Sequence, residues 1–501
     1  MINKSFIKSI VTILMLSVFL LLAAFQRITP LPSGPDWKDN ALIAYHLAKT
    51  GDFALEDERN SNKLYPTNFR EPLPIFIWAI AANMNGNLLE NKFESFVSSG
   101  GLLAMKKANL LILMLLFFAT FLLLELIPPG LISGLEKTML FIFLAFTYQA
   151  YGLVGGVNQI SSDIHSATLM LLFISGLLVY FRQPSLMKAG VAGLVYALLC
   201  LTKAAFFYVG FVLFASALLS SLYSKYFVLR HVLVSFLTML LIVSPWLVRN
   251  GCALQQFSIS GRGGETMMDR KFEEIYNEQH LSGMFYAYSP DFLKPVMSRL
   301  TGYTFRDRLP GGRLQHTTRD YGWELKARDA LQMDAVINSH HKASVFIRKI
   351  YNHFYEAYKS PVLARKYAEQ QYKKFVFEEA LHHPVRHLKF GLLFAWRGLW
   401  VTNYVDGRAY EVFGVKRGWI KELLPAVGFF SLIIITAYGL VKRSPILIAI
   451  TATPISVYCF YFLFTHNIPR YSLHLLPVWC LSLGLLLLWI KNKLKLFLSN
   501  R

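Results

Sequence analysis

The sequence contains few cysteines and few charged residues. Four of its 501 residues are cysteine, and because Cys200, Cys459 and Cys480 lie in apolar segments, no disulfide framework is predicted. Charged residues make up 16% of the chain, which is low for a soluble protein. Acidic residues are fewer than basic ones, with 30 Asp and Glu against 51 Lys and Arg, so the formal net charge is +21. No nucleic-acid-binding motif accompanies this charge, so we predict no nucleic-acid partner.

Motifs for metals and nucleotides are also absent. The chain has no His-Glu-x-x-His, no Walker loop and no dinucleotide fingerprint. His382, His383 and His387 lie near Glu379 in sequence, but Pro384 interrupts the helix that would align them, so no metal site is predicted. The sequence requires no cofactor, although it is compatible with a divalent cation. No internal repeat is visible, which argues against transporters built from repeats.

Long apolar runs are abundant, since hydrophobic residues make up 54% of the chain. Runs of this length predict an all-α polytopic membrane protein with about ten transmembrane helices. Lys4 and Lys8 precede the first run, Ile10 to Phe25, so we place the N-terminus in the cytoplasm and interpret this run as an uncleaved span. A cleaved signal peptide is the alternative. The other crossings are predicted at residues 101–126, 138–153, 167–181, 189–201, 206–222, 232–248, 423–441, 446–464 and 473–490.

The spans and the long polar stretch between them predict three parts. These are an N-terminal transmembrane module, an extracytoplasmic region and C-terminal transmembrane helices, at residues 1–248, 249–421 and 422–501. The first external loop covers residues 27–100, and within it Pro72 to Met84 is apolar but short. We therefore predict an interfacial or re-entrant helix there, with Trp78 at headgroup depth.

The extracytoplasmic region is expected to be mainly helical. Helix-forming residues are frequent from Glu324 to Ala380. Pro384 to Trp400 has the pattern of a juxtamembrane amphipathic helix that lies on the membrane.

The first external loop contains acidic residues at the start of a predicted helix. Apolar residues recur at helical spacing after Asp36, and Gly51 suits the left-handed conformation that ends many helices. Asp36 and Asp39 at such a position are typical of capping residues, which bind free backbone N–H groups and complement the helix dipole. Arg70 and Glu71 follow later in the loop, just before the Pro72 helix.

Three further groups of polar residues fall at external ends of predicted spans. Asp163 lies in the second external loop, where a helix cap is again the plain interpretation. Pro245-Trp246-Leu-Val-Arg249-Asn250 is followed by a Ser/Gly-rich element that contains Arg262. Two interpretations are open for this group. In the first, Trp246 belongs to the aromatic belt and Arg249 faces the lipid; in the second, Arg249 or Arg262 binds a phosphate. The last group runs from Thr465 to His474 and includes His466, Arg470 and Tyr471, of which Arg470 is either a topological anchor or the partner of a lipid phosphate.

These motifs together resemble the GT-C glycosyltransferases, most closely the branch of protein O-mannosyltransferases and the lipid A aminoarabinose transferase. The resemblance implies a GT-C fold and makes Asp36 the catalytic carboxylate. Asp163 matches the acidic residue of the second external loop and is the second predicted catalytic residue, since two carboxylates on one face suit acid/base chemistry. It also implies a lysine near the donor phosphate, here Lys203. The predicted donor-phosphate residues are then Lys203, Arg249, Arg262, Arg470 and Tyr471, and the predicted substrate-binding residues are Arg70, Glu71 and His466.

The chain departs from this pattern at two places. Glu71 stands where the aminoarabinose transferase has a lysine, and Ile468 stands where the family has an acidic residue before its Arg-Tyr pair. Residues 267–380 match no known element, so the acceptor stays open between lipid A, another envelope glycan and protein.

The predicted function is an inverting transfer of a sugar from a polyprenyl-phosphate donor. We expect it at the periplasmic face of a bacterial inner membrane, in contact with membrane lipid. Alternatives are a transporter or flippase of lipid-linked glycans, which would favour charges in mid-span, and an O-antigen ligase or polymerase.

Overall fold

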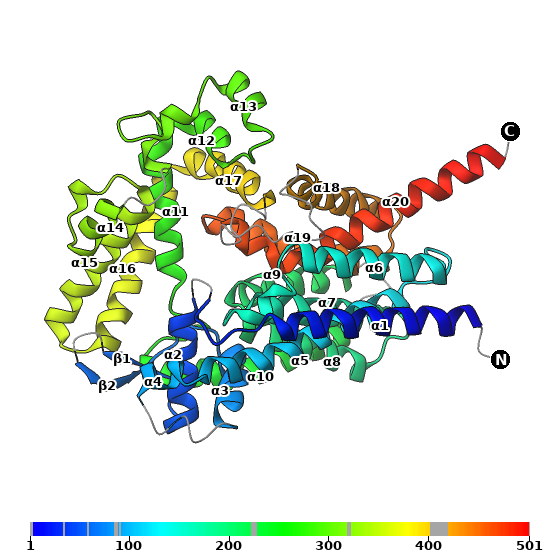
Figure 1. The fold of residues 1–501 in the computed structure, drawn as a ribbon, viewed down its shortest axis with the longest axis horizontal. Helices are drawn as coiled ribbons and strands as arrows, with labels where there is room; N and C mark the ends of the chain where they lie inside the picture. Colours follow the sequence, from blue (N-terminus) through cyan, green and yellow to red (C-terminus); the bar gives the residue numbers. More distant parts are fainter. Residues whose placement is uncertain are drawn as a thin grey trace.

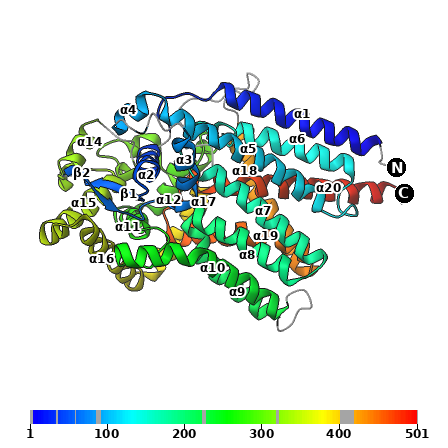
Figure 2. The ribbon, with the colours of Figure 1, turned by 90° about the horizontal axis from the view of Figure 1, so that it is seen from below.

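The computed structural model describes residues 4–33, 36–57, 60–84, 89, 92–221, 228–317, 322–400 and 419–499. It consists of a bundle of long apolar helices and a helical region, α11 to α17, that lies across one end of the bundle (Figure 1). We call this the covered end. The start of α1 and the end of α20 lie at the opposite end, as Figure 2 shows from below.

Eight helices in the described part of the chain are long and apolar enough to cross a membrane. This confirms the predicted class, a mainly α polytopic membrane protein. Two other predicted crossings form shorter apolar helices, Ile10–Gln26 within α1 (Lys4–Gln26) and α8 (Leu186–Thr202). The eight span candidates lie in α5 (Gly101–Leu126), α6 (Gly134–Ala150) with η2 (Gly155–Asn158), α7 (Asp163–Arg182), α9 (Ala204–Ser221), α10 (Leu229–Leu254), α18 (Trp419–Val441), α19 (Pro445–Phe464), and η8 (Pro469–Leu475) with α20 (Leu476–Ser499).

The loop between α1 and α5 is folded against the covered end. As predicted, a helix follows Asp36, and it ends at Gly51 with φ 79°. The sequence analysis missed a hairpin, in which β1 pairs antiparallel with β2 and Leu55 lies opposite Tyr65. The elements of this loop are α2 (Trp37–Thr50), β1 (Ala54–Asp57), β2 (Asn60–Pro66), α3 (Pro72–Asn83) and α4 (Phe93–Ser98).

Trp78 on α3 is buried inside the protein, and its depth in the membrane stays a prediction. Its side chain is 1% exposed, its indole N–H donates to Asn109 Oδ1 at 2.9 Å, and its ring meets His165 edge-on. A buried indole needs a hydrogen-bond acceptor, and α5 supplies one. Trp78 therefore fixes α3 to the bundle.

The region over the covered end is helical, as expected from its composition. Its own core joins α11, α15 and α16 through Met268, Phe272, Ala343, Ala368 and Tyr372. The helices are α11 (Gly263–Asn277), α12 (Leu281–Tyr288), α13 (Lys294–Thr301), α14 (Gly322–Asp329), α15 (Ser339–Tyr358), α16 (Pro361–His382) and α17 (Pro384–Leu399), with short 3₁₀ turns η3 (Glu278–His280), η4 (Phe305–Arg308), η5 (Gln315–Thr317) and η6 (Met333–Ala335).

The contact between α17 and the bundle is close. A Cβ atom at Gly398 would lie 2.2 Å from Asn467 Nδ2, so only glycine allows this approach. Asn467 uses the same amide to donate to Phe394 O at 2.9 Å. The loop before η8 is thereby held against α17.

Candidate active site

Five charged side chains from distant parts of the sequence meet at the covered end. They come from the start of α2, the segment before α3, the start of α7, the junction of α8 with α9, and η8. We call Asp36, Arg70, Asp163, Lys203 and Arg470 the charge cluster.

Asp36 precedes α2 but does not cap it. Its side chain makes no hydrogen bond to the first backbone N–H groups of the helix. Instead, Arg470 Nη1 donates to Asp36 Oδ2 at 2.6 Å, and Arg70 Nη1 lies 3.0 Å from Oδ1. Arg262 Nη1 is 3.8 Å from the same oxygen. The capping interpretation therefore does not explain the position of this carboxylate.

The arginines set the protonation state of Asp36. Burial alone would raise the pKa of its carboxyl group, but the charges of Arg70, Arg470 and Arg262 outweigh burial and lower the pKa to about 2. Asp36 is therefore ionised throughout the physiological pH range.

Asp163 also uses its side chain for ion pairs and not for a helix cap. Lys203 Nζ donates to Oδ1 at 2.7 Å, and Arg470 Nε donates to Oδ2 at 2.8 Å. The carboxylate is buried, with 6% of the side chain exposed. A buried carboxylate is stable only when paired, and here both oxygens have a cationic partner.

Arg470 joins the two carboxylates, because it gives Nε to Asp163 and Nη1 to Asp36. Pro469 at the first turn of η8 begins the helical segment that carries it. Two carboxylates thus share one guanidinium, the group best shaped to bind two oxyanions at once.

Lys203 occupies a break between two apolar helices. Its backbone is extended, with φ −149° and ψ 117°, so α8 ends and α9 begins around it. Its Nζ atom also lies 3.1 Å from His474 Nδ1, which can accept from the ammonium only in the tautomer that leaves Nδ1 unprotonated. The helix break places the lysine at the covered end and not in mid-span.

Two residues in contact with the cluster were not assigned a site role from the sequence. Asp39 was interpreted as a cap, yet its Oδ2 accepts from Arg70 Nη2 at 2.6 Å. His474 lies next to Lys203. Asp39 lies three residues after Asp36 on the same helix face, and this spacing is the signal that identifies it.

Arg249 is engaged outside the cluster. Its guanidinium donates to Thr67 O at 2.6 Å, to Phe53 O at 2.7 Å and to Asn250 Oδ1 at 2.9 Å. Its neighbour Trp246 is buried and donates to a backbone carbonyl, so it is no aromatic-belt residue. Arg249 clamps the hairpin loop to α10.

The remaining predicted residues line the surroundings of the cluster. Glu71 Oε1 accepts weakly from the backbone N–H of Ala204 at 3.5 Å. The ring of Tyr471 lies 5.7 Å from that of His466, whose pKa is lowered chiefly by burial. In the described part of the chain, Glu71, Tyr471 and His466 lie around the cluster without a hydrogen bond to Asp36 or Asp163.

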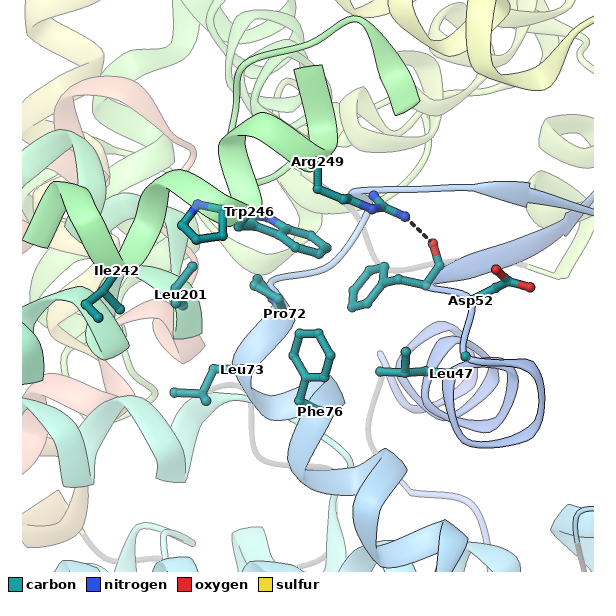
Figure 3. Close-up of a pocket in the computed structure, with 12 residues that line it drawn as sticks. Leu47, Asp52, Pro72, Leu73, Phe76, Leu201, Ile242, Trp246 and Arg249 are labelled. Carbon is teal, nitrogen blue, oxygen red and sulfur yellow. Dashed lines mark hydrogen bonds between the residues drawn. The ribbon is translucent and has the colours of Figure 1, made fainter. Parts of the chain in front are cut away.

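An apolar groove opens beside the first loop (Figure 3). Its volume is about 510 Å³, and its walls come from α2, α3, α8 and α10. Leu73 and Phe76 project into it from α3, Leu201 and Ile242 come from the bundle, and Arg249 lies at one end. Most of the side chains that line the groove are apolar.

Within the described residues, no group of three or more His, Cys, Asp or Glu side chains is arranged to hold a metal ion. Each carboxylate of the charge cluster has an Arg or Lys of the chain as its counterion. His387, one of the three clustered histidines, instead lies 3.1 Å from Glu274 in a buried network.

The fold and the cluster define a class: a polytopic membrane protein with a site of paired charges at one end of its bundle. No known family profile matches the sequence, and no curated protein matches it.

Solved structures do match. The oligosaccharyltransferase AglB from Archaeoglobus fulgidus, in complex with an inhibitory peptide and a dolichol-phosphate, is 13% identical at a TM-score of 0.47, with 97% of this chain and 51% of that one covered. The same archaeal enzyme tethered to an acceptor peptide is 14% identical at a TM-score of 0.49, covering 98% and 51%. ArnT from Cupriavidus metallidurans, bound to undecaprenyl phosphate, is 12% identical at 0.38, covering 94% and 77%.

These likenesses extend over most of this chain but at low sequence identity. The chain spans about half the length of the archaeal enzyme. At identities of 12–14% and TM-scores below 0.5, these matches assign no donor, acceptor or catalytic residue.

Proposed function

We propose that the protein is an integral-membrane glycosyltransferase that moves a sugar from a polyprenyl-phosphate donor to a cell-envelope acceptor. The observation that carries this proposal is the position of Asp36, an ionised carboxylate that leaves its helix uncapped and shares Arg470 with a second carboxylate. The site is expected at the extracytoplasmic face of a bacterial inner membrane, with lipid A, a glycan or a protein as acceptor.

The cations of the cluster suit a phosphate-linked donor. Arg70, Lys203 and Arg470 are the groups that would stabilise charge on a departing lipid phosphate. They are neutralised by Asp36, Asp39 and Asp163, so a phosphate has to compete with these carboxylates. Donor binding would therefore weaken the ion pairs between these arginines and Asp36.

This competition gives Asp36 its role as a base. A carboxylate with a pKa of about 2 is a weak base, because an effective base has a pKa nearer the working pH. When the phosphate takes over Arg470 and Arg70, the pKa of Asp36 rises. The acceptor hydroxyl then gives its proton to Asp36 while its oxygen attacks the anomeric carbon, and the lipid phosphate leaves with the electron pair of the broken bond.

Asp163 is assigned a positioning role. It contacts Lys203 and Arg470 through separate oxygens and so holds both cations side by side. The apolar groove of Figure 3 is proposed to take part of the polyprenyl chain, since its walls include bundle side chains such as Leu201 and Ile242.

The test is transfer of labelled sugar from polyprenyl-phosphate donors in membranes that contain equal amounts of each variant. Asp36→Asn is expected to lose about 10²-fold to 10⁴-fold in rate, which is the usual contribution of general-base catalysis, while donor binding is retained. Asp39→Asn is the matched control, since it removes a carboxylate from the same helix and the same arginine and should retain most activity.

An equal loss of transfer rate in Asp36→Asn and Asp39→Asn would show that both carboxylates only hold Arg70 in place. It would overturn the assignment of Asp36 as the base. Donor binding without transfer by the wild type, over a panel of envelope acceptors, would favour a transporter of lipid-linked glycans.

A further inference from the structure

A cluster of apolar side chains is bare on the helical region, away from the charge cluster. It lies on residues 291–313, which comprise α13, η4 and the turns around them, and we call this segment the α13 tip. Val296, Leu300, Phe305 and Leu309 are exposed by 52%, 76%, 64% and 40%. Large apolar side chains that are exposed together on one short segment are typical of a surface that contacts a protein or a membrane.

The tip is folded and not simply loose. Met297 packs into a small core with Tyr286, Tyr303 and Leu314, and α13 ends at Gly302 with φ 70°. Val296 and Leu300 are one helical turn apart and share a face. The segment thus has an inner apolar side with partners and an outer apolar side without protein cover among the described residues.

The root of the tip is at the covered end of the bundle. Phe292 and Leu293, just before α13, pack on the main bundle core. The ring of Phe292 meets that of Trp400 edge-on at 6.2 Å, and Trp400 follows α17. Figure 1 shows α13 to the side of α17, at the end of the bundle where α17 and α18 lie. The tip is therefore joined to the covered end of the bundle at its root.

The charge of the tip favours an anionic lipid surface. Residues 291–313 carry five basic and two acidic residues. The two acidic residues are already used, Asp291 by Lys294 and Asp307 by Arg313. Arg299 and Arg306 are exposed, and neither is ion-paired with a residue that the structure describes. Basic residues beside exposed apolar ones are typical of segments that bind at the membrane interface.

We propose that the α13 tip is a second membrane contact, in which Val296, Leu300, Phe305 and Leu309 enter the interface of the adjacent leaflet and Arg299 and Arg306 bind anionic phospholipid headgroups. This contact holds the helical region against the bilayer at a point outside the bundle. It is independent of the glycosyltransferase proposal, because it requires no donor and no catalytic residue.

The test uses the full chain in nanodiscs of phosphatidylglycerol and phosphatidylcholine. In a Cys252→Ser, Cys459→Ala background, a nitroxide label is attached to Leu300→Cys or Phe305→Cys, with Lys374→Cys as control, since Lys374 is 67% exposed on α16. Collisions with oxygen, which concentrates in lipid, are compared with collisions with a water-soluble nickel chelate. We expect the two tip labels to favour oxygen and the Lys374 label to favour the chelate.

Replacing Arg299 and Arg306 with Gln, or omitting phosphatidylglycerol, should shift the tip labels toward the chelate, by about fivefold in the ratio of inserted to free tip per arginine. Tip labels as chelate-accessible as the Lys374 label would overturn the proposal and favour a protein partner for this surface. Insertion that is insensitive to both arginines and to lipid charge would overturn the headgroup assignment.

Discussion

The ion pair between Asp163 and Lys203 should be strongly coupled. Lys203→Met leaves Asp163 buried with Arg470 as its remaining partner, and Asp163→Asn leaves two cations without their shared anion. Removing one member of a buried pair costs about 3 to 5 kcal/mol, largely because the other charge stays buried. Since Arg470 compensates Asp163 in part, we expect each single variant near about 3 kcal/mol.

The double variant Asp163→Asn, Lys203→Met removes both charges, so it should be little worse than either single one. The predicted coupling energy is about 2 to 3 kcal/mol. It is measured from unfolding free energies of all four proteins, obtained by steric trapping in lipid bicelles. The exposed pair Asp291 and Lys294 is the control cycle and should give less than about 1 kcal/mol. If the free-energy changes of the two single variants add up to that of the double variant within about 0.5 kcal/mol, Asp163 and Lys203 do not interact. That result would contradict the buried ion pair between them.

Three further outcomes are expected. The folded-state pKa of Asp36 is lowered to about 2. Its ionised carboxylate therefore stabilises the folded state fully above its unfolded pKa of about 3.9, and this stabilisation is lost as the pH falls toward 2. The acid unfolding curve of Asp36→Asn should lack this loss. Arg249→Gln should lower thermal stability because it removes the hydrogen bond to Thr67. Donor affinity, measured by titration, should change by less than about threefold. A large loss of affinity would show instead that Arg249 binds the donor phosphate. Gly398→Ala should destabilise the protein by about 1 to 3 kcal/mol, because the new methyl group meets Asn467, and an unchanged unfolding temperature would show that the contact yields.

Local patterns in the sequence predicted the helices well. The apolar run at residues 101–126 coincides with α5, and Gly51 ends α2 in the left-handed conformation expected of it. These features depend on hydrophobicity and backbone freedom within one segment. The β1–β2 hairpin escaped prediction because its strands lack a clear alternation of apolar and polar residues.

The contacts of the candidate site could be predicted only in part. The motifs indicated Asp36, Asp163, Lys203 and Arg470, but which cation meets which carboxylate is decided by packing. Trp78 shows the same limit: a tryptophan in a short apolar helix is typical of the membrane interface, and only the position of Asn109 on α5 makes it a buried donor.

Arg470 contributes to the cluster from very late in the chain, 434 positions after Asp36 and 307 after Asp163. During synthesis, Asp36, Asp163 and Lys203 are all made before this arginine exists, so Asp36 and Asp163 lack this shared counterion until the last helices insert. The charge compensation of Asp36 and Asp163 therefore depends on a residue that is synthesised long after both of them.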